Sequence, residues 1–141
     1  MSLTPPRHKN KTVATFLALV MGWAGVHRVY LRSARDTWAL LHLASMPAST
    51  LVLLLAPHAN IYYQLLPMIV SFLAGLLEGL VIGLLPDEKF DIRYNAGSSR
   101  QSASNWPLAL ILVGMMLVGT IALIATISRL FDLLYTGGAY G

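Results

Sequence analysis

The chain has 141 residues, enough for one small domain, and carries a net charge of +4. It is 56% hydrophobic and only 11% charged, against roughly 25% charged residues in soluble domains, so the composition indicates an integral membrane protein. The absence of cysteine excludes disulfides and thiolate metal sites. The basic residues lie outside the long apolar runs, where they fix membrane orientation, and we do not expect nucleic-acid binding.

Residues 1–11 form a basic tail in which Pro5 and Pro6 disfavour helix. Four apolar segments follow, at residues 12–26, 37–56, 61–85 and 106–127. A spanning helix needs about 20 apolar residues, which the last two segments satisfy. The second is long enough but contains His42 and Pro47, which allow a kink. We therefore predict an all-α integral membrane protein, a helical hairpin or bundle with three to four transmembrane segments.

The first apolar segment is ambiguous. It has only 15 residues before His27. It spans only if Tyr30 and Leu31 also enter the membrane and Arg28 extends its charged end to the interface. A cleavable signal peptide is the alternative, but no convincing small-residue cleavage pattern follows.

The links between the segments predict their orientation. Three arginines lie between the first two segments, and Lys89, Arg93 and Arg100 lie between the last two, whereas residues 57–60 contain no Lys or Arg. The positive-inside rule places both basic links in the cytoplasm and residues 57–60 outside. The basic N-terminal tail also favours the cytoplasm, which conflicts with a spanning first segment. Either that segment is short and interfacial, or the six inner charges outweigh the three outer ones.

Residues 96–105 are rich in Gly and Ser and predict a flexible linker. The linker separates a membrane domain at 12–95 from an additional C-terminal transmembrane helix at 106–135. For that helix, Asn105 is the expected N-cap, Pro107 suits the first turn, and Trp106 and Tyr135 suit the two interfaces.

Glu78 is the most informative single residue. It lies eight residues before Pro86, about 12 Å along a helix. A carboxylate inside a membrane costs several kcal/mol (roughly 3) unless it is paired, protonated or hydrated. We expect Arg28 or His27 to pair with it, with His42 as a second candidate. The pair is either structural or part of a proton or ion relay.

A second pattern lies around Glu78. Gly75, Gly79 and Gly83 are spaced by four and, with Ser71, form a smooth face for close helix packing. The pattern does not say whether the partner helix is internal or belongs to another subunit. We find no catalytic residues, no cofactor motif and no metal site, because His27 and His42 lack a ligand set with usable spacing.

The stretch "HKNKTVATFLALVMGWAGVHRVYL" resembles the start of the TM-two domain family, which is named for its two transmembrane helices and is called NINE protein in bacteria. The family's helix ends in a glycine-containing turn, which Gly22, Gly25, His27–Arg28, Tyr30 and Leu31 match. Later, "LPMIVSFLAGLLEGL" and "PDEKFDIRYN" resemble the family's second helix and its end, including Pro67, Glu78, Asp87, Glu88, Phe90, Asp91, Tyr94 and Asn95.

The resemblance covers residues 9–95, and the chain departs from it at several points. Val29 replaces a Phe, Arg32 replaces a Gly, residues 45–60 look like an insertion, and the C-terminal helix has no counterpart. The resemblance implies a small membrane protein without established enzymatic activity, with its His–Arg turn in the cytoplasm.

Two functions follow as expectations. The first is a non-enzymatic accessory or assembly subunit in the bacterial inner membrane, whose glycine face docks on helices of a larger complex or of a homo-oligomer. The alternative is a proton or ion conduit or transporter component that uses Glu78. The expected surroundings are the lipid bilayer and other transmembrane helices.

Overall fold

The computed structural model describes residues 7–140, so Pro5 and Pro6 lie outside the described residues. The described chain consists of helices and connecting turns, without a strand, which confirms the all-α prediction. In chain order the helices are α1 (Lys11–Met21), the short 3₁₀ helix η1 (Gly22–Ala24), α2 (Val26–Leu31), α3 (Thr37–Leu55), α4 (Ile61–Leu84), α5 (Asp87–Tyr94) and α6 (Trp106–Tyr135).

Three of these helices are long and apolar enough to cross a membrane, which agrees with the predicted three to four segments. α3 has 19 residues and continues through Pro47, α4 has 24, and α6 has 30. α6 begins as predicted, because the Asn105 side chain accepts a hydrogen bond from the Leu108 N–H and Pro107 occupies the first turn. It ends at Tyr135, as predicted for the C-terminal helix at 106–135, and so continues past its apolar run at 106–127.

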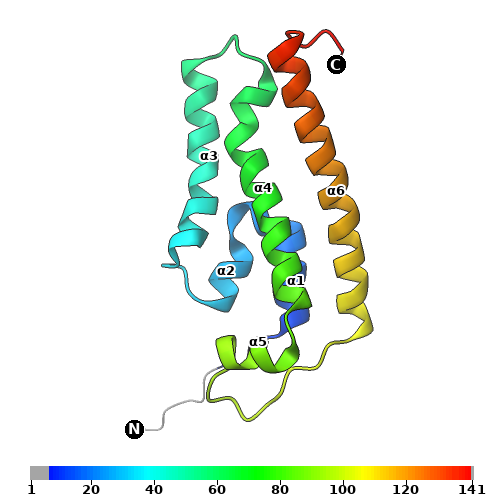
Figure 1. Cartoon of the computed structure of the whole chain (residues 1–141). Helices are drawn as coiled ribbons and strands as arrows, with labels where there is room; N and C mark the ends of the chain where they lie inside the picture. The colour runs from blue at the N-terminus through cyan, green and yellow to red at the C-terminus, as the bar shows by residue number, and fades with distance from the viewer. Residues whose placement is uncertain (1–6, 141) are drawn as a thin grey trace.

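The first apolar segment does not span the bundle; it forms a re-entrant hairpin. α1 runs along the lower half of α4, η1 turns the chain, and α2 returns to the end where α1 began (Figure 1). The Asn10 N–H donates to the Tyr30 hydroxyl over 2.9 Å, so the two ends of the hairpin lie side by side. The start of α1 therefore lies at the same end of the molecule as α5 and both basic links (Figure 1).

Two glycines make the hairpin turn possible. Gly25 has φ of 71°, in the left-handed region that side chains disfavour, and a Cβ there would lie 3.0 Å from the Ala39 backbone. Gly22 lies against Gly75, where its Cβ would be 3.1 Å from the Gly75 Cα. The tip of the hairpin thus packs directly on the backbone of α4.

The hairpin packs on the face of α4 that is formed by its glycines. Along it, Gly75 meets Gly22, Gly79 meets Ala18, and Gly83 meets Thr15. From the other side α6 adds Met115 over Gly79 and Leu112 over Gly83. The partner helices of the glycine face are therefore internal, which answers the question that the sequence left open. α6 is consequently an integral part of the bundle.

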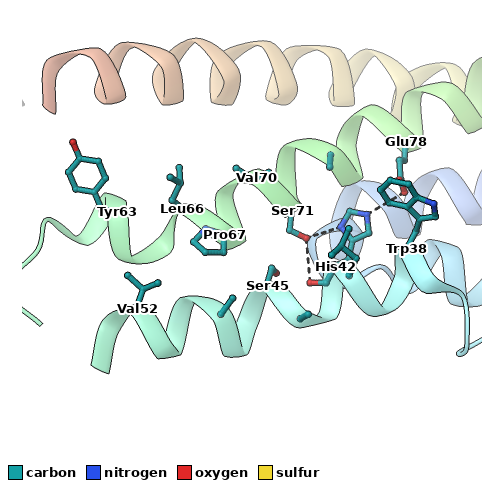
Figure 2. A pocket seen from close by; sticks show the side chains of 14 residues that line it. Trp38, His42, Ser45, Val52, Tyr63, Leu66, Pro67, Val70, Ser71 and Glu78 are labelled. Atoms are coloured by element: carbon teal, nitrogen blue, oxygen red, sulfur yellow. Dashed lines mark hydrogen bonds and ion pairs between the residues drawn. The ribbon is translucent and has the colours of Figure 1, made fainter. Parts of the chain in front are cut away.

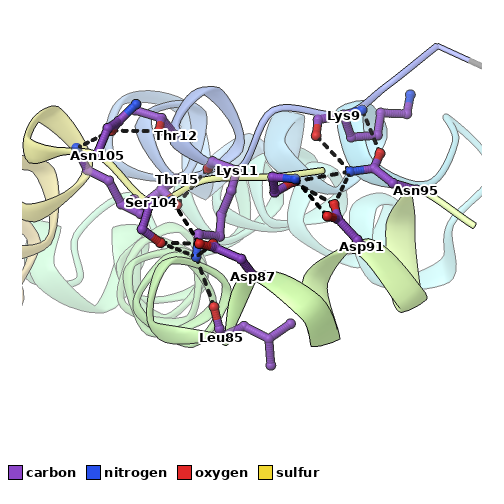
Figure 3. Close-up of polar contacts among 12 residues, drawn as sticks. Lys9, Lys11, Thr12, Thr15, Leu85, Asp87, Asp91, Asn95, Ser104 and Asn105 are labelled. Atoms are coloured by element: carbon purple, nitrogen blue, oxygen red, sulfur yellow. Dashed lines mark hydrogen bonds and ion pairs between the residues drawn. The ribbon is translucent and has the colours of Figure 1, made fainter. Parts of the chain in front are cut away.

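A network that we call the polar latch ties α1, α5 and the linker together at the N-terminal end (Figure 3). Asp87 binds the Lys11 ammonium and accepts from the Ser104 N–H over 2.8 Å. Asp91 accepts from the Ser102 N–H over 2.7 Å. These contacts hold the linker against α5, which its Gly/Ser composition did not predict. The latch also includes Lys9, which is hydrogen-bonded to Asn95.

α5 itself packs on the bundle through Phe90. This side chain is 0% exposed and belongs to a cluster with Ala14, Leu31 and Ile82. One turn later, the Tyr94 ring lies 5.0 Å from that of Phe90. The helix therefore closes the lower end of the core.

Candidate functional site: a buried polar cluster

Glu78 lies at the centre of a polar cluster between α2, α3 and α4, which we call the Glu78 cluster: Glu78, His27, Arg28, His42 and Ser71. The Arg28 Nε and Nη2 atoms each donate to one carboxylate oxygen of Glu78, both over 2.6 Å. The His27 Nε2 lies 2.7 Å from Glu78 Oε2, and the His42 Nε2 lies 3.4 Å from the same oxygen. The structure thus brings together the residues that the sequence analysis paired, including His42, its second candidate.

The hairpin is what delivers two of these side chains. Because the left-handed Gly25 starts α2 at the middle of the bundle, His27 and Arg28 fall in its first turn, beside α4. Gly25 N–H donates back to the Gly22 carbonyl over 3.0 Å, which closes the turn. The glycine-containing motif and the Glu78 cluster are therefore one structural unit, because the turn directs His27 and Arg28 toward Glu78.

Ser71 connects the cluster to the tip of the hairpin. Its hydroxyl lies 2.7 Å from the Trp23 carbonyl, one of the backbone groups that the turn leaves without a helical partner. His42 Nδ1 lies 2.7 Å from the same hydroxyl oxygen (Figure 2). The His42 tautomer decides which of these two atoms donates, and His42 Nε2 faces Glu78 on the other side of the ring.

The fold places Ser71 beside His42, a hydroxyl–imidazole pair that the sequence analysis did not identify. The Ser71 hydroxyl also lies 2.7 Å from the Trp23 carbonyl, which competes with His42 for the single hydroxyl proton. The contact joins α3, α4 and η1, and we interpret it as a structural link.

Asp36 extends the cluster to the surface, and the sequence analysis did not identify it. Its carboxylate caps α3 by accepting from the Ala39 N–H over 3.2 Å, and it lies 3.4 Å from Arg28 Nη1. Burial by itself would raise the pKa of Asp36. The hydrogen bond from the Ala39 N–H and the charges of Arg28 and Arg32 lower the pKa by more than burial raises it, so it lies below the ordinary range. The Asp–Thr pair that opens α3 is a helix-start signal that points to this residue.

The donor atoms of the cluster also resemble a metal ligand set. One ligand atom each from His27, His42 and Glu78 lie within 4.8 Å of one another. Two histidines and one glutamate are a common set of Zn²⁺ ligands. The spacing of these three residues in the sequence gave no sign that they lie together. In the structure, however, Arg28 bonds to both oxygens of Glu78. A cation would have to displace that guanidinium, so the geometry favours the ion pair over a metal centre.

A groove of about 660 Å³ runs between α3 and α4 from Val52 and Tyr63 to Trp38 and the Glu78 cluster (Figure 2). Its wall contains the small side chains of Ala44, Ala48 and Ala74, together with Ser45, which is 7% exposed. Within the described residues the Ser45 hydroxyl has no hydrogen-bond partner. The groove therefore combines close access to the α3 backbone with an unsatisfied polar group.

Comparison of the chain with models of protein families, with curated proteins and with solved structures found no match.

Proposed function

We propose that the protein is a non-enzymatic accessory or assembly subunit of the TM-two domain type in the bacterial cytoplasmic membrane, and that it binds a transmembrane helix of its partner in the α3/α4 groove. The three apolar helices make it a membrane protein. The glycine face that the sequence analysis offered for docking is covered by α1 and α6, so the docking surface has to be another one.

The single observation that carries this proposal is the groove wall of small side chains, which includes Ser45, whose buried hydroxyl has no hydrogen-bond partner within the described residues. Inside a membrane, helices associate through small residues that let backbones approach and through hydrogen bonds between helices. The alanines of the groove supply the first, and Ser45 supplies the second when its hydroxyl rotates toward the occupant. An acyl chain could fill the volume, but it has no group that bonds to the hydroxyl. This favours a helix with a polar side chain as the occupant.

A photo-crosslinking side chain introduced at Ala44 tests the proposal in native membranes. We expect one discrete adduct whose cross-linked peptide maps to a transmembrane segment, either of another protein or of a second copy. Ala48→Phe, which fills the groove, should remove that adduct. The matched control is the same crosslinker at Met46, two residues away and about 200° around α3. Lipid adducts alone at both positions would contradict the docking proposal.

The alternative, a proton or ion conduit, has one observation in its favour. A chain of polar contacts runs from Asp36 through Arg28, Glu78 and His42 to Ser71 and the Trp23 carbonyl. It extends from the end of the bundle to the tip of the hairpin. The groove beyond it is lined mainly by apolar side chains, so we place the conduit second.

Glu78→Gln separates the two functions in reconstituted vesicles and native membranes. The docking proposal expects weaker cross-linking and no change in proton flux, because loss of the Arg28 pair loosens the hairpin. The conduit expects the flux to fall while the partner adduct persists. Gln64→Leu, a buried change on the same helix outside the Glu78 cluster that adds no charge, controls for general disturbance of α4.

A further inference from the structure

A second pocket, separate from the groove except for a shared edge at Glu78, lies between α2, α4 and α5. It has a volume of about 210 Å³. Three guanidinium groups line it, those of Arg28, Arg32 and Arg93. We call it the arginine pocket. The α2 and α5 residues that line it belong to helices at the end of the bundle where α1 begins (Figure 1).

The charges in the arginine pocket do not balance. Arg28 is matched by Glu78, to which both of its bonds are 2.6 Å long. Arg32 lies 3.3 Å from Asp36, a carboxylate that Arg28 shares at 3.4 Å. Arg93 lies over the Tyr94 ring, 5.6 Å from its centroid. Three cations thus face two carboxylates, and the exposed Arg32 and Arg93 side chains keep donors for an anion.

The other wall of the arginine pocket is apolar and open to the surroundings. Leu77 and Val81 of α4 line it and are 63% and 58% exposed. These two residues belong to a helix that is long and apolar enough to span a membrane, so their exposed faces meet acyl chains. A ligand that fits both walls has an anionic head and an apolar tail.

We propose that the arginine pocket binds the phosphate of an anionic phospholipid from the leaflet at that end of the bundle, with its acyl chains lying over Leu77 and Val81. Basic pockets between transmembrane helices at this level hold anionic headgroups, because the charge attraction acts at the edge of a low-dielectric medium. A free phosphate shares the charge but gains nothing from the apolar wall, so a lipid is the ligand that both walls select. This inference does not depend on the proposed docking function.

Native mass spectrometry of the purified, delipidated full chain tests this directly. We expect one phosphatidylglycerol to remain bound at concentrations where phosphatidylcholine with the same acyl chains does not. The double variant Arg32→Gln/Arg93→Gln should lower the phosphatidylglycerol affinity about tenfold or more, since each basic residue near such a lipid contributes on the order of a severalfold change. Arg28 is left intact because it neutralises Glu78.

The matched control is Arg35→Gln/Arg100→Gln. It removes the same charge from the same end of the bundle, from exposed residues outside the arginine pocket. We expect its affinity to stay within about twofold of the parent. Circular dichroism and size-exclusion chromatography confirm that both double variants are folded.

Three results would overturn the proposal. Equal losses in the two double variants would mean that only general surface charge attracts the lipid. Equal binding of phosphatidylcholine would mean that the headgroup is not recognised. Protection of the protein against heat by inorganic phosphate or glycerol 3-phosphate, to the same degree as by phosphatidylglycerol, would mean that the site binds free anions.

Discussion

Glu78 enters the bundle with both carboxylate oxygens bonded to Arg28, and that pairing fixes how the hairpin sits on α4. Taking a carboxylate and a guanidinium out of water is expensive, and their attraction offsets this only with good geometry and further hydrogen bonds. Here the two 2.6 Å bonds supply the geometry, and His27 supplies a further contact at 2.7 Å. Removal of one partner leaves an uncompensated charge in the bundle.

The first prediction concerns this pair. Arg28→Met should destabilise the protein by about 3–5 kcal/mol, because Glu78 then stays buried without its cation. The double variant Arg28→Met/Glu78→Met should recover most of that loss, because neither charge remains. Thermal unfolding in detergent measures both. Arg35→Met, an exposed arginine at the same end, is the control and should change stability by less than about 1 kcal/mol. A double variant no more stable than Arg28→Met would contradict the pairing.

The contacts between elements explain why the hairpin lies where it does. α1 and η1 run along α4 with one small residue over each glycine, so the backbones approach more closely than larger side chains would allow. Inside lipid such close approach is a main source of helix association, because burial of apolar surface gives little advantage there.

The second prediction compares two glycines of similar helical setting. Gly75→Ala should destabilise the fold by about 1–3 kcal/mol, because its Cβ would lie 2.5 Å from the Gly22 carbonyl carbon, an atom of the backbone that cannot move aside. Gly114→Ala in α6 should be neutral or slightly stabilising, since nothing lies within 4 Å of that Cβ. Unfolding in detergent compares the two. If Gly75→Ala is as stable as Gly114→Ala, the close packing of η1 on α4 is wrong.

The third prediction concerns the polar latch and pH. Burial raises the pKa of Asp87, but the hydrogen bonds from Lys11 and Ser104 lower it by more. In the same way burial raises the pKa of Asp91, and the hydrogen bonds from Asn95 and Ser102 lower it by more. Both folded pKa values therefore lie below the ordinary value of 3.8. The latch is fully stabilising above that value and weakens as pH falls through the lowered folded pKa.

A spin label at position 99 measures this. We expect the linker to be immobile at neutral pH and to gain mobility only under strongly acidic conditions. Asp87→Ala/Asp91→Ala should be mobile at neutral pH already, because the lost carboxylates accept the bonds from Ser102 and Ser104. A label that is equally mobile in the parent and the variant at neutral pH would show that the latch does not hold the linker.

At this scale the sequence predicted the long helices well and the hairpin poorly. Composition and cap signals such as Asn105 located α3, α4 and α6 because these depend on local runs of apolar residues. The first segment was left ambiguous, since its length suits neither a full span nor a surface helix. Its return depends on Gly25 meeting Ala39 and on Gly22 meeting Gly75, contacts between distant positions that periodicity cannot show.

In the candidate site, too, the sequence predicted some residues and missed others. The cost of a charge in the membrane was enough to pair Glu78 with Arg28 or His27. It could not place Ser71, which the glycine spacing assigned to the packing face and which also bonds to Trp23 and His42. Nor could it find Asp36, whose role depends on the position of Arg28 after the turn.

For the whole molecule, the re-entrant hairpin removes a conflict in the charge distribution. If α1 crossed the membrane, the basic residues Arg7, Lys9 and Lys11 would lie opposite both basic links. Because the chain returns, these residues join the links at one end, and within residues 7–140 Arg129 is the one Lys or Arg located toward the other end (Figure 1). Apart from Arg129 the distribution agrees with the positive-inside rule, and it collects the charge that the arginine pocket uses.

The hairpin topology is the central claim, and thiol labelling tests it most directly. The chain has no cysteine, so His8→Cys, Ser99→Cys and His58→Cys each introduce a single reactive group. In sealed vesicles of known orientation, a membrane-impermeant maleimide should label positions 8 and 99 from the same side and position 58 from the opposite side. Labelling of position 8 from the same side as position 58 would show that the first helix crosses the membrane and would contradict the account.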